Sequence, residues 1–587
     1  MVSRPASAEA RLSWARRHVA GLIAALVAAA GIVNLVSGLT PEFHSRLRSI
    51  VDFVPGVVSG IATATTVVSG LLLLMLAKGL RRRKQRAWRG AVVLLGVSIF
   101  THLVKGLDVE ESGLAFGVLI ALIMTRNEFT AKGDPRTRWR SVSVGGSMFA
   151  ASVVTGMVLM RLYEDSLQGP HGLARQLRFV LKGLVGIQGT INLTGRADEV
   201  IPAVLGGLGI ITVLTVAYLL LRPSEPVASL LPEDEARMRD LLARYGGRDS
   251  LGYFALRRDK SVVWSPSGKA CIAYRVLSGV MLASGDPLGD PEAWPGAITA
   301  MQCLAEQHAW VPAVIGCGEL AATAYARAGL STIEFGDEAV VEVKDFTLEG
   351  RAMRGVRQAV NRVERAGYVA QVRRVADISE EDRKEMVLQA RAWRSAETER
   401  GFSMALGRFG DPCDGECVAV TATQNGCLRA FLHFVPWGSD GLSLDLMRRD
   451  READNGLNEF LIVSAMKAAQ ELGVKRMSLN FAVFRAALER GERIGAGPIS
   501  RAFRGLLVFS SRWFQIDSLY RFNAKFRPIW EPRFVCYPGA GDLPRVSLAA
   551  LEAEAFLVWP MTKLGHWLRR GKPSPASQHA EPAAVTA

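Results

Sequence analysis

Residues 441–485 read GLSLDLMRRDREADNGLNEFLIVSAMKAAQELGVKRMSLNFAVFR, and this stretch decides the fold of the second half of the chain. Apolar and polar residues alternate at its start, which predicts a strand over Leu442–Leu446. An amphipathic helix follows and ends at Gly473, and a second strand is expected over Arg476–Phe481. This order predicts a β-α-β unit with a parallel, right-handed crossover.

Charged side chains gather where the first of these strands ends. Simple alternation places Leu442, Leu444 and Leu446 on one face of the strand, and Ser443, Asp445 and Met447 on the other. Arg448 and Arg449 follow at its end. A carboxylate and two guanidiniums beside a helix start are well placed to bind a polar substrate. An ion pair at a sheet edge is the alternative interpretation.

The length, charge and cysteine content of the chain limit the classes of protein to which it can belong. The chain has 587 residues, 49% of them hydrophobic, and a formal net charge of +15. This length predicts several domains. The positive charge suits an acidic partner such as anionic lipid headgroups or nucleic acid. Basic loops that set membrane topology are an alternative source of the charge. Of the seven cysteines only Cys413 and Cys417 are close, and no second pair or nearby His completes a zinc site. No metal is therefore expected.

The first 222 residues contain recurring apolar runs, most of them near the roughly 20 residues that a bilayer needs. Six spans are expected, at Val19–Leu39, Pro55–Leu80, Gly90–Leu107, Gly113–Thr125, Val142–Leu162 and Ile201–Leu221. The third and fourth are weaker, and a re-entrant hairpin is the alternative there. Loops on the side of the amino terminus carry roughly twice as many Lys and Arg as those on the other side, which predicts a cytoplasmic amino terminus and a return to the cytoplasm at Arg222.

The connection from Tyr163 to Glu199 is longer than a simple loop. Its apolar part, Phe179–Ile187, is expected to lie in the membrane interface or to re-enter the membrane, and an outer loop is the alternative. The spans themselves contain few charged residues, so an ion pathway is not indicated.

A proline-containing linker from Pro223 to Pro232 separates this region from one with alternating helices and strands. In the first part, helices are expected at 233–245, 294–308 and 320–328, and strands at 253–256, 261–264, 270–276, 280–284 and 311–317. A similar order begins near Glu334, with a basic helix at 348–366 and strands at 368–375, 417–423 and 428–436. The pattern predicts two copies of a mixed α/β layer.

Two basic stretches have both a functional and a structural interpretation. The helix at 348–366 contains Arg354 and Arg357 among five arginines, and its basic face either contacts phosphates or is simply solvated. Residues 504–537 interleave aromatic and basic side chains, which can bind nucleic acid or lipid headgroups by stacking and charge. The rim of a buried core has the same composition.

Several motifs in order resemble the aminoacyl-phosphatidylglycerol synthases of the multiple peptide resistance factor type. They are SLDLMR at 443–448, Asn455-Gly456 with Glu459-Phe460, SLNFA at 478–482, KFRP at 525–528 with Trp530, Pro532 and Arg533, and the helix end RVERAG at 362–367. The resemblance covers roughly residues 230 to 545. It is to the actinobacterial branch, here without an appended lysyl-tRNA synthetase domain.

This resemblance implies a polytopic α-helical membrane domain at 1–222 and two α/β (α+β) GNAT-like acyltransferase domains at 223–345 and 346–545, the second with the catalytic motifs. A terminal helix and a disordered tail are expected at 546–587. The implied reaction moves lysine or alanine from aminoacyl-tRNA to phosphatidylglycerol, which lowers the negative charge of the membrane surface and gives resistance to cationic antimicrobial peptides. The implied protein is a multi-pass plasma-membrane enzyme with its catalytic domain in the cytoplasm. It uses aminoacyl-tRNA as a co-substrate and has no cofactor. A homo-oligomer is a possible assembly.

By motif, the implied catalytic residues are Asp445, Arg448, Lys525 and Arg527. The implied substrate-binding residues are Arg449, Asn455, Glu459, Asn480, Arg354, Arg357 and Arg533. The membrane half is much shorter than in the large flippase-synthase members, so lipid flipping is not expected. A further acidic residue of the family has no assigned counterpart, since Asp517 is the only carboxylate between Arg501 and Lys525.

Such a reaction is ester-to-ester acyl transfer, so the donor is already activated and positioning can supply much of the rate. Asp445 is expected to orient or deprotonate the lipid hydroxyl, or to hold the ammonium of the amino acid. Arg448 and Lys525 are expected to neutralise phosphate, and a cation to stabilise the tetrahedral oxyanion. No Ser-His-Asp or Cys-His set is evident, so no covalent enzyme intermediate is expected.

Three alternatives to this interpretation remain open. The acceptor is diacylglycerol in the first. The second is an acetyl-CoA-dependent acetyltransferase on a membrane anchor, whose glycine-rich loop would be Glu492–Gly497. That loop lacks an Arg or Gln three residues before its first glycine, and Pro498 follows it directly. The third is a lipid transporter or scaffold without activity.

Overall fold

The computed structural model describes residues 6–39, 56–106, 109–131, 136–168, 172–187, 191–221, 226, 228–394, 401–483 and 516–557. The chain divides into a helical unit that ends at Glu225 and a mixed α/β unit that begins at Pro226. The expected glycine-rich loop at 492–497 and the expected tail beyond residue 557 lie outside the described residues.

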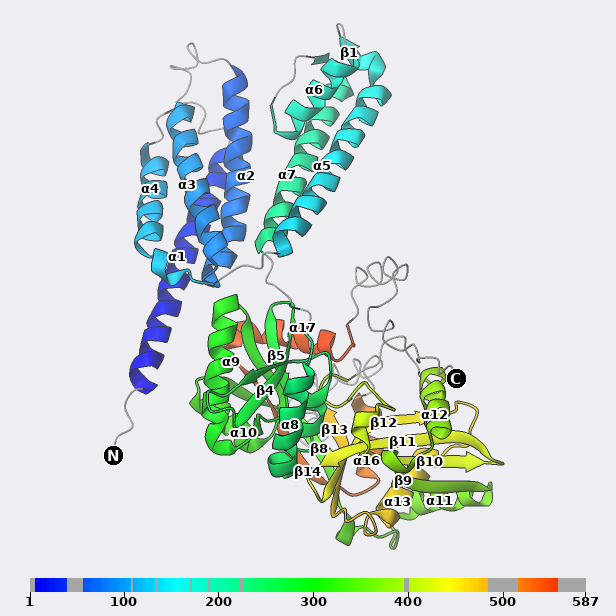
Figure 1. Cartoon of the computed structure of the whole chain (residues 1–587). Coiled ribbons are helices and arrows are strands. Elements are labelled where there is room, and N and C mark those ends of the chain that lie inside the picture. Colours follow the sequence, from blue (N-terminus) through cyan, green and yellow to red (C-terminus); the bar gives the residue numbers. More distant parts are fainter. Residues whose placement is uncertain are drawn as a thin grey trace, which may run out of the picture. The chain divides into compact units, whose positions relative to one another are not determined.

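All six expected spans coincide with helices of the first unit (Figure 1). Its helices are α1 (Ala6–Leu39), α2 (Gly56–Arg81), α3 (Gln85–Gly106), α4 (Val109–Met124), α5 (Arg136–Leu162), α6 (Leu173–Leu184) and α7 (Arg196–Leu221). In the described part, three segments are long and apolar enough to cross a membrane: Val19–Val36 in α1, Ser141–Leu162 in α5 and Arg196–Leu220 in α7. The apolar segment of α4, Ser112–Met124, is shorter. The additional helix α6 lies in the long connection.

Close helix packing in this unit uses small residues, as is usual in membranes. A Cβ atom on Gly31 of α1 would lie 2.9 Å from the carbonyl oxygen of Gly70 of α2, so the two backbones touch. The buried amide of Asn34 donates to Ser98 Oγ of α3 at 2.9 Å. Glycines and the hydrogen bonds between Asn34 and Ser98 therefore fix α1 against α2 and α3.

The second unit is built on one twelve-stranded sheet. Its strands are β3 (Ser261–Trp264), β4 (Ala270–Leu277), β5 (Val280–Ser284), β6 (Leu288–Gly289), β7 (Val311–Cys317), β8 (Ser331–Glu342), β9 (Tyr368–Arg374), β10 (Val418–Gln424), β11 (Cys427–Trp437), β12 (Gly441–Arg449), β13 (Arg476–Val483) and β14 (Ile529–Tyr537). The order across the sheet is β3-β4-β5-β7-β14-β8-β13-β12-β11-β10-β9, with β6 beside β4.

The predicted duplication is visible in the connections. In each half an antiparallel meander ends in a strand that a helix joins to its parallel neighbour: β5, α9 (Trp294–His308) and β7 in the first half, and β12, α13 (Leu457–Ala468) and β13 in the second. The predicted β-α-β unit and the predicted fold class are therefore confirmed. The other helices of this unit are α8 (Pro232–Tyr245), α10 (Glu319–Arg327), α11 (Arg354–Arg365), α12 (Glu380–Ala392), α16 (Ile516–Ala524) and α17 (Leu543–Ala553).

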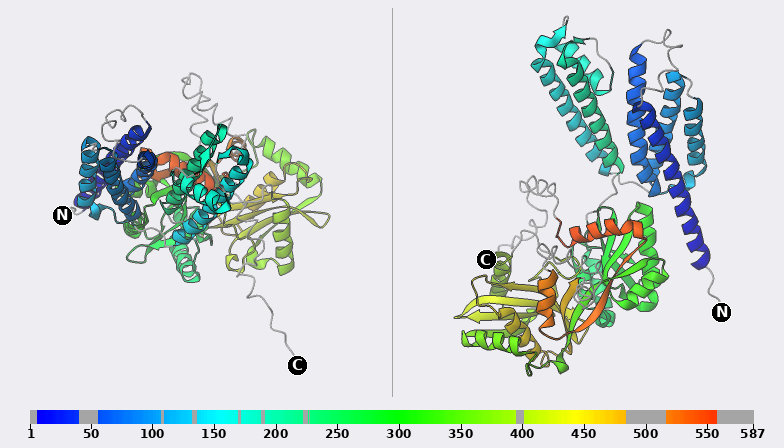
Figure 2. Two further views of the ribbon diagram at one scale, coloured as in Figure 1. Left: turned by 90° about the horizontal axis from the view of Figure 1, so that it is seen from above. Right: turned by 180° about the vertical axis from the view of Figure 1, so that it is seen from behind.

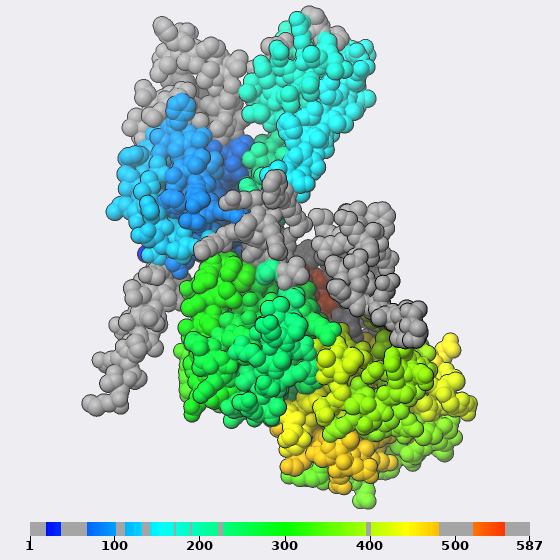
Figure 3. Space-filling model, viewed as in Figure 1, coloured from blue at the N-terminus to red at the C-terminus, as the bar shows by residue number. Residues whose placement is uncertain are grey.

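A strand from the end of the chain joins the two halves. β14 pairs antiparallel with both β7 and β8, and β8 pairs on its other side with β13. Figure 2 shows β14 in orange among green strands of the first half, and in Figure 3 the green and yellow-to-orange halves form one continuous body. The expected boundary between residues 345 and 346 divides the chain just after β8, but it does not divide the sheet. The expected boundary after residue 545 falls inside α17, which packs against β5.

Two local predictions differ from the structure. The apolar run expected as a strand at 253–256 forms a short 3-10 helix, Gly252–Leu256, which is buried throughout. Periodicity cannot separate a short buried strand from a buried helical turn. The basic helix expected from residue 348 begins only at Arg354, and the carbonyls of Leu348 and Gly350 in the preceding turn accept hydrogen bonds from Arg357.

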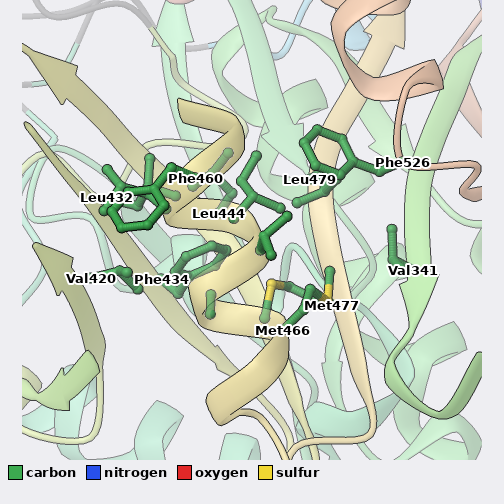
Figure 4. Packing of buried hydrophobic residues seen from close by; sticks show 14 of the residues in the cluster. Val341, Val420, Leu432, Phe434, Leu444, Phe460, Met466, Met477, Leu479 and Phe526 are labelled. Carbon is green, nitrogen blue, oxygen red and sulfur yellow. The ribbon is translucent and has the colours of Figure 1, made fainter. Parts of the chain in front are cut away.

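The main core of the second half lies between its strands and α13. Figure 4 shows Phe460 and Met466 of α13 packed over strand residues, including Leu432, Phe434 and Leu444. Burial of this apolar face, at about 25 cal/mol per Å², is what holds α13 in the crossover between β12 and β13.

Candidate functional site at the splayed strand pair

Strands β12 and β13 pair for only part of their described length. Parallel pairing covers Gly441–Ser443 opposite Arg476–Ser478. Directly beyond it each strand carries an irregularity, β12 at Asp445 against β11, and β13 between Ser478 and Phe481 against β8. The two strands therefore separate toward their carboxyl ends. Ligands of open α/β sheets bind outside such ends.

The irregularity in β12 is a β-bulge that leaves Asp445 as the extra residue. Leu444 pairs with Phe434, and Leu446 pairs with the next residue of β11, His433. Because a bulge adds one residue, the alternation of faces reverses beyond it. Leu444 joins the α13 core, whereas Leu446 joins a core on the opposite face. The prediction that Leu446 shares a face with Leu444 is therefore wrong.

The same bulge places Asp445 and Arg448 on one face of the sheet. Simple alternation would put them on opposite faces, since they are three residues apart. Arg448 instead pairs with Phe431, which belongs to the same core as Leu446. Cross-strand partners project from the same face. Beside the bulge, Asn480 of β13 has a φ of +87°, which is unusual for a residue other than glycine.

The carboxylate of Asp445 is buried and accepts two hydrogen bonds. Oδ2 lies 2.7 Å from Nδ1 of His433, and the side chains of the two residues are 3% and 2% exposed. Oδ1 accepts the backbone N–H of Leu406 at 2.6 Å. Burial lowers the pKa of His433, but hydrogen bonds to Asp445 and Cys417 outweigh it and raise the pKa to about 10. The partner that the structure gives Asp445 is therefore a histidine that sequence reasoning missed, and the ion pair with an arginine at the sheet edge stays a prediction.

The structure brings Lys525 and Glu459 together at the start of α13. Lys525 Nζ lies 2.8 Å from Glu459 Oε1, and the lysine side chain is 47% exposed. Phe526 is buried beside Leu479 (Figure 4), and the amide of Asn523 donates to the Leu479 carbonyl at 3.2 Å. These contacts anchor the Lys-Phe motif on β13, beside the splayed pair.

Arg527 follows with a φ of +51° and is exposed. The described residues include no hydrogen-bond or ion-pair partner of its side chain. Its guanidinium is therefore available to a ligand at the same end of the sheet.

A basic rim surrounds the start of α13. Arg362 of α11 donates to the carbonyl of Asn455 at 3.1 Å, and Arg449 of β12 donates to its side-chain oxygen at 3.5 Å. Gly456 has a φ of +104°, and a Cβ atom there would lie 3.1 Å from the Cβ of Ala359. A glycine is therefore required where α11 crosses the start of α13.

Two further predicted arginines have different environments. Arg354 is exposed at the first position of α11. Arg357 donates to the carbonyls of Leu348 and Gly350, so its guanidinium stabilises the turn that precedes the helix.

The predicted substrate-binding role of Arg533 is contradicted by its hydrogen bonds, which use all five of its N–H donors. Its side chain is 4% exposed and forms ion pairs with Asp249, at 2.7 Å, and with Glu338. Ser250 and the carbonyl of Gly316 accept its remaining hydrogen bonds. This guanidinium has no face left for a substrate, and it instead joins β14 to β8 and to the first half.

The expectation of no metal site stays a prediction. Among the described residues, no group of three or more His, Cys, Asp or Glu side chains is placed to hold a metal ion. Cys413 is exposed and Cys417 is buried. Asp517 lies in α16, but its side chain is outside the described residues.

Two family models match this chain. Residues 239–537 match the model "Phosphatidylglycerol lysyltransferase, C-terminal", and residues 15–221 match "Transmembrane region of lysyl-tRNA synthetase". The chain belongs to the phosphatidylglycerol lysyltransferase family. The first match contains the whole splayed pair and the Lys-Phe motif, and the second contains all but the start of the helical unit.

Curated relatives share this family and are longer. The chain is 41% identical over 554 residues to the lysylphosphatidylglycerol biosynthesis bifunctional protein LysX of Rhodococcus jostii, which covers 92% of this chain and 49% of that protein. It is 42% identical over 516 residues to LysX of Mycobacterium tuberculosis, strain H37Rv, which covers 85% and 43%. The chain thus spans about half the length of these relatives.

Two solved structures match parts of the chain. One is the C-terminal domain of a putative lysylphosphatidylglycerol synthetase from Agrobacterium fabrum, with 26% identity, a TM-score of 0.46, and coverage of 54% of this chain and 96% of that chain. Another is L-PGS from Bacillus licheniformis, with 22% identity, a TM-score of 0.47, and coverage of 56% and 99%.

In this family member, the first half of the sheet supports the site through the segment Gly401–Leu406. The guanidinium of Arg257 donates to the carbonyls of Gly401 and Ala405, the latter at 2.7 Å. The backbone N–H of Leu406 then binds Asp445. Sequence patterns give no signal for the contact between Leu406 and Asp445, because these residues are far apart in the chain and the segment Gly401–Leu406 is irregular.

The same segment covers a buried lysine. Lys260 Nζ donates to Ser284 Oγ at 2.7 Å and to the Phe254 carbonyl at 3.1 Å, and it lies 4.4 Å from the ring centroid of Phe402. Burial lowers the pKa of Lys260 to about 7. A cation that is only partly charged at neutral pH therefore lies beneath the segment that holds Asp445.

Proposed function

We propose that the chain is a membrane-bound aminoacyltransferase that moves lysine from lysyl-tRNA to a glycerol hydroxyl of phosphatidylglycerol. The observation that carries the proposal is the bulge in β12, which places Asp445 and Arg448 on one face at the open end of β12 and β13. The match over residues 239–537 supports the lipid substrate. The names of the curated relatives support lysine over alanine and phosphatidylglycerol over diacylglycerol.

The proposed reaction exchanges one ester for another. The lipid hydroxyl oxygen attacks the carbonyl carbon of the aminoacyl ester, the bond from that carbon to the ribose oxygen breaks, and the hydroxyl proton passes to the ribose. Because the donor ester is already activated, catalysis consists of positioning and of stabilising the oxyanion of the tetrahedral intermediate.

Asp445 is proposed to bind the ammonium group of the aminoacyl moiety. A carboxylate has about four acceptor positions, and His433 and the Leu406 N–H occupy two of them. Both carboxylate oxygens are held in place by these two donors, which suits a fixed acceptor for an ammonium group. A binding role therefore fits this environment better than a general-base role.

The cations at the sheet end are proposed to neutralise phosphates. Arg448 lies on the face of Asp445, and we assign it to the oxyanion or to the phosphate nearest the ester. Lys525, Arg527 and the rim that includes Arg362 and Arg449 suit the phosphates of the tRNA acceptor end and of the lipid. Lys525 must exchange Glu459 for a phosphate, which its partial exposure permits.

The mixed α/β unit is proposed to face the cytoplasm, where aminoacyl-tRNA is found. The distribution of Lys and Arg between the loops supports this orientation.

The experiment is transfer by the purified full chain in phosphatidylglycerol vesicles. Labelled lysyl-tRNA is supplied, lipids are extracted, and labelled lipid is counted for the wild type, Asp445→Asn and the control Asp440→Asn, which changes a carboxylate at the opposite end of β12. We expect the wild type and Asp440→Asn to label lipid and Asp445→Asn to lose this activity. Ribonuclease treatment of the donor should abolish the labelling. Labelling that resists ribonuclease, or full activity of Asp445→Asn, would contradict the proposal.

A further inference from the structure

Helix α6 packs against both α5 and α7, which also pack against each other, and it ends halfway along α7. A Cβ atom on Gly156 of α5 would lie 2.5 Å from Val180 of α6. Farther along, a Cβ atom on Gly209 of α7 would overlap the carbonyl oxygen of Leu184. Gly209 is thirteen residues after the start of α7, or about 20 Å at 1.5 Å per residue. The end of α6 is therefore level with the middle of a helix that is long enough to cross a membrane (Figure 1).

The chain turns back at this depth. Gly186 has a φ of +77°, and the N–H of Ile187 donates to the carbonyl of Lys182 at 2.9 Å. The segment begins and ends at one level, because β1 (Leu167–Gln168) before α6 pairs with β2 (Asn192–Leu193) after it. This path fits the re-entrant arrangement among those expected for the connection. The hydrogen bonds of the turn satisfy backbone groups that lipid could not.

Three different faces run along α6. The face against α5 and α7 is made of Gln176, Phe179, Val180 and Leu184, all buried. A second, exposed and apolar, consists of Leu173, Leu177 and Leu181. The third consists of Arg175, Arg178 and Lys182, spaced three and four residues apart, so that they form one row. The described residues include no hydrogen-bond or ion-pair partner of Arg178 or Lys182.

Along the axis of α7, the basic row of α6 extends past the polar first turn of α7 to the level of its apolar part. Asp198 and Glu199 lie in the first turn of α7, and its apolar run follows. Gly183, next to Lys182, lies against Leu205. Leu205 is six residues beyond Glu199, or about 9 Å along the axis. A cation at the depth of Lys182 is rare unless an anion or water accompanies it, and Arg178 lies about one turn closer to the surface.

We propose that the row formed by Arg178 and Lys182 binds the phosphate of an anionic phospholipid, phosphatidylglycerol, whose headgroup is drawn below the surface beside α6. The leucine row then contacts its acyl chains. The site lies in the half of the membrane that holds the first part of α7. The acceptor lipid of the transfer reaction must instead be reached from the other end of α7, where the chain continues into the mixed α/β unit. This site is separate from the acceptor site, and its test needs no transferase activity.

The experiment measures lipid selectivity of the full chain in phosphatidylcholine nanodiscs. Spin-labelled phosphatidylglycerol or phosphatidylcholine is added, and the motionally restricted fraction of each is recorded. The variant Arg178→Gln/Lys182→Gln is compared with Arg161→Gln/Arg196→Gln, which removes two exposed cations at the adjoining ends of α5 and α7. Each cation near anionic lipid contributes about fivefold to binding, so the α6 variant should lose at least about fivefold of its preference for phosphatidylglycerol.

The control variant should retain most of that preference. Equal losses in both variants would show only a general attraction of surface charge, and no loss in the α6 variant would show that its cations extend to the surface instead. Either result overturns the proposal. Depth is tested separately in Leu181→Trp, since lipids brominated well below the headgroup should quench this tryptophan more than lipids brominated near it. Stronger quenching by shallow bromines would place α6 on the surface and would also overturn the proposal.

Discussion

Asp445 and His433 form a buried ion pair on adjacent strands, with 2.7 Å between Oδ2 and Nδ1. The pair exists because the bulge inserts Asp445 beside the position where His433 meets Leu446. Removing one partner of a buried pair leaves the other charge unpaired and typically costs about 3–5 kcal/mol. We expect His433→Gln to lower the free energy of unfolding of the mixed α/β unit by an amount in this range, measured by urea titration. A loss below about 0.5 kcal/mol, within the range of ordinary surface substitutions, would contradict this interpretation of the pair.

The pH dependence of stability should show two opposing contributions. The pKa of His433 is raised from 6.5 to about 10, so its stabilisation is fully present below pH 6.5 and is lost as the pH rises through 10. The pKa of Lys260 is lowered from 10.5 to about 7, so its cost is largest below pH 7 and disappears as the pH rises toward 10.5. Between pH 7 and 10 the two slopes have opposite signs, each at most about 1.4 kcal/mol per pH unit.

Single variants should separate these slopes. In Lys260→Met, stability should fall with pH between 7 and 10, because only the histidine contribution remains. In His433→Gln it should rise over the same range. Urea titrations at several pH values measure both, and parallel pH profiles for the two variants would show that neither group has the assigned pKa.

Arg533 should matter for folding and not for substrate binding. Arg533→Met leaves Glu338 and Asp249 buried without a cation, and we expect a loss of about 3–5 kcal/mol. Arg533→Lys should also destabilise, because an ammonium cannot reproduce the several fixed contacts of the guanidinium. The control Arg527→Gln changes an exposed cation and should shift stability by less than about 0.5 kcal/mol while lowering lysine transfer. The assignment fails if Arg533→Met unfolds at the wild-type urea concentration.

The sequence pattern was sufficient for the β-α-β unit but not for the geometry of the site. Leu442, Leu444 and Leu446 continue an unbroken alternation through the bulge, so nothing in the pattern shows that the faces reverse at Asp445. The second core, on the opposite face, accepts Leu446 as readily as the first would. Physical pattern alone therefore identifies the strand and its charged end, but it places Asp445 and Arg448 on different faces.

The sequence pattern also could not predict which residues that are distant in the chain become neighbours in the fold. β14 lies between β7 and β8, far from its neighbours in sequence, and its order in the sheet depends on contacts that no local pattern encodes. Arg533 therefore looked like one more cation in an aromatic and basic stretch, although the sheet buries it. Lys525 and Glu459 are 66 residues apart, and only the folded chain brings them together.

Gly456 should tolerate substitution less well than another glycine of similar conformation. Gly456→Ala places a Cβ 3.1 Å from Ala359 in a backbone with a φ of +104°, whereas Gly473 has a φ of +71° and open space around it. We expect Gly473→Ala to cost about 1 kcal/mol and Gly456→Ala a further 1–2 kcal/mol, because strain and crowding add at the second site. Thermal unfolding of both variants measures this, and an equal cost would show that α11 does not press on the start of α13.

Lys525 and Glu459 allow stability and substrate binding to be separated. Their ion pair is partly exposed, so a double-mutant cycle of Lys525→Met and Glu459→Gln should give a coupling in unfolding free energy of only about 0.2–1 kcal/mol. Transfer of lysine should respond differently. If Lys525 exchanges Glu459 for a phosphate, Lys525→Met should raise KM for lysyl-tRNA, whereas Glu459→Gln should retain or lower it, because the competing carboxylate is gone. A Glu459→Gln variant with KM raised as far as in Lys525→Met would instead assign the pair a structural role, with the lysine held in place for packing alone.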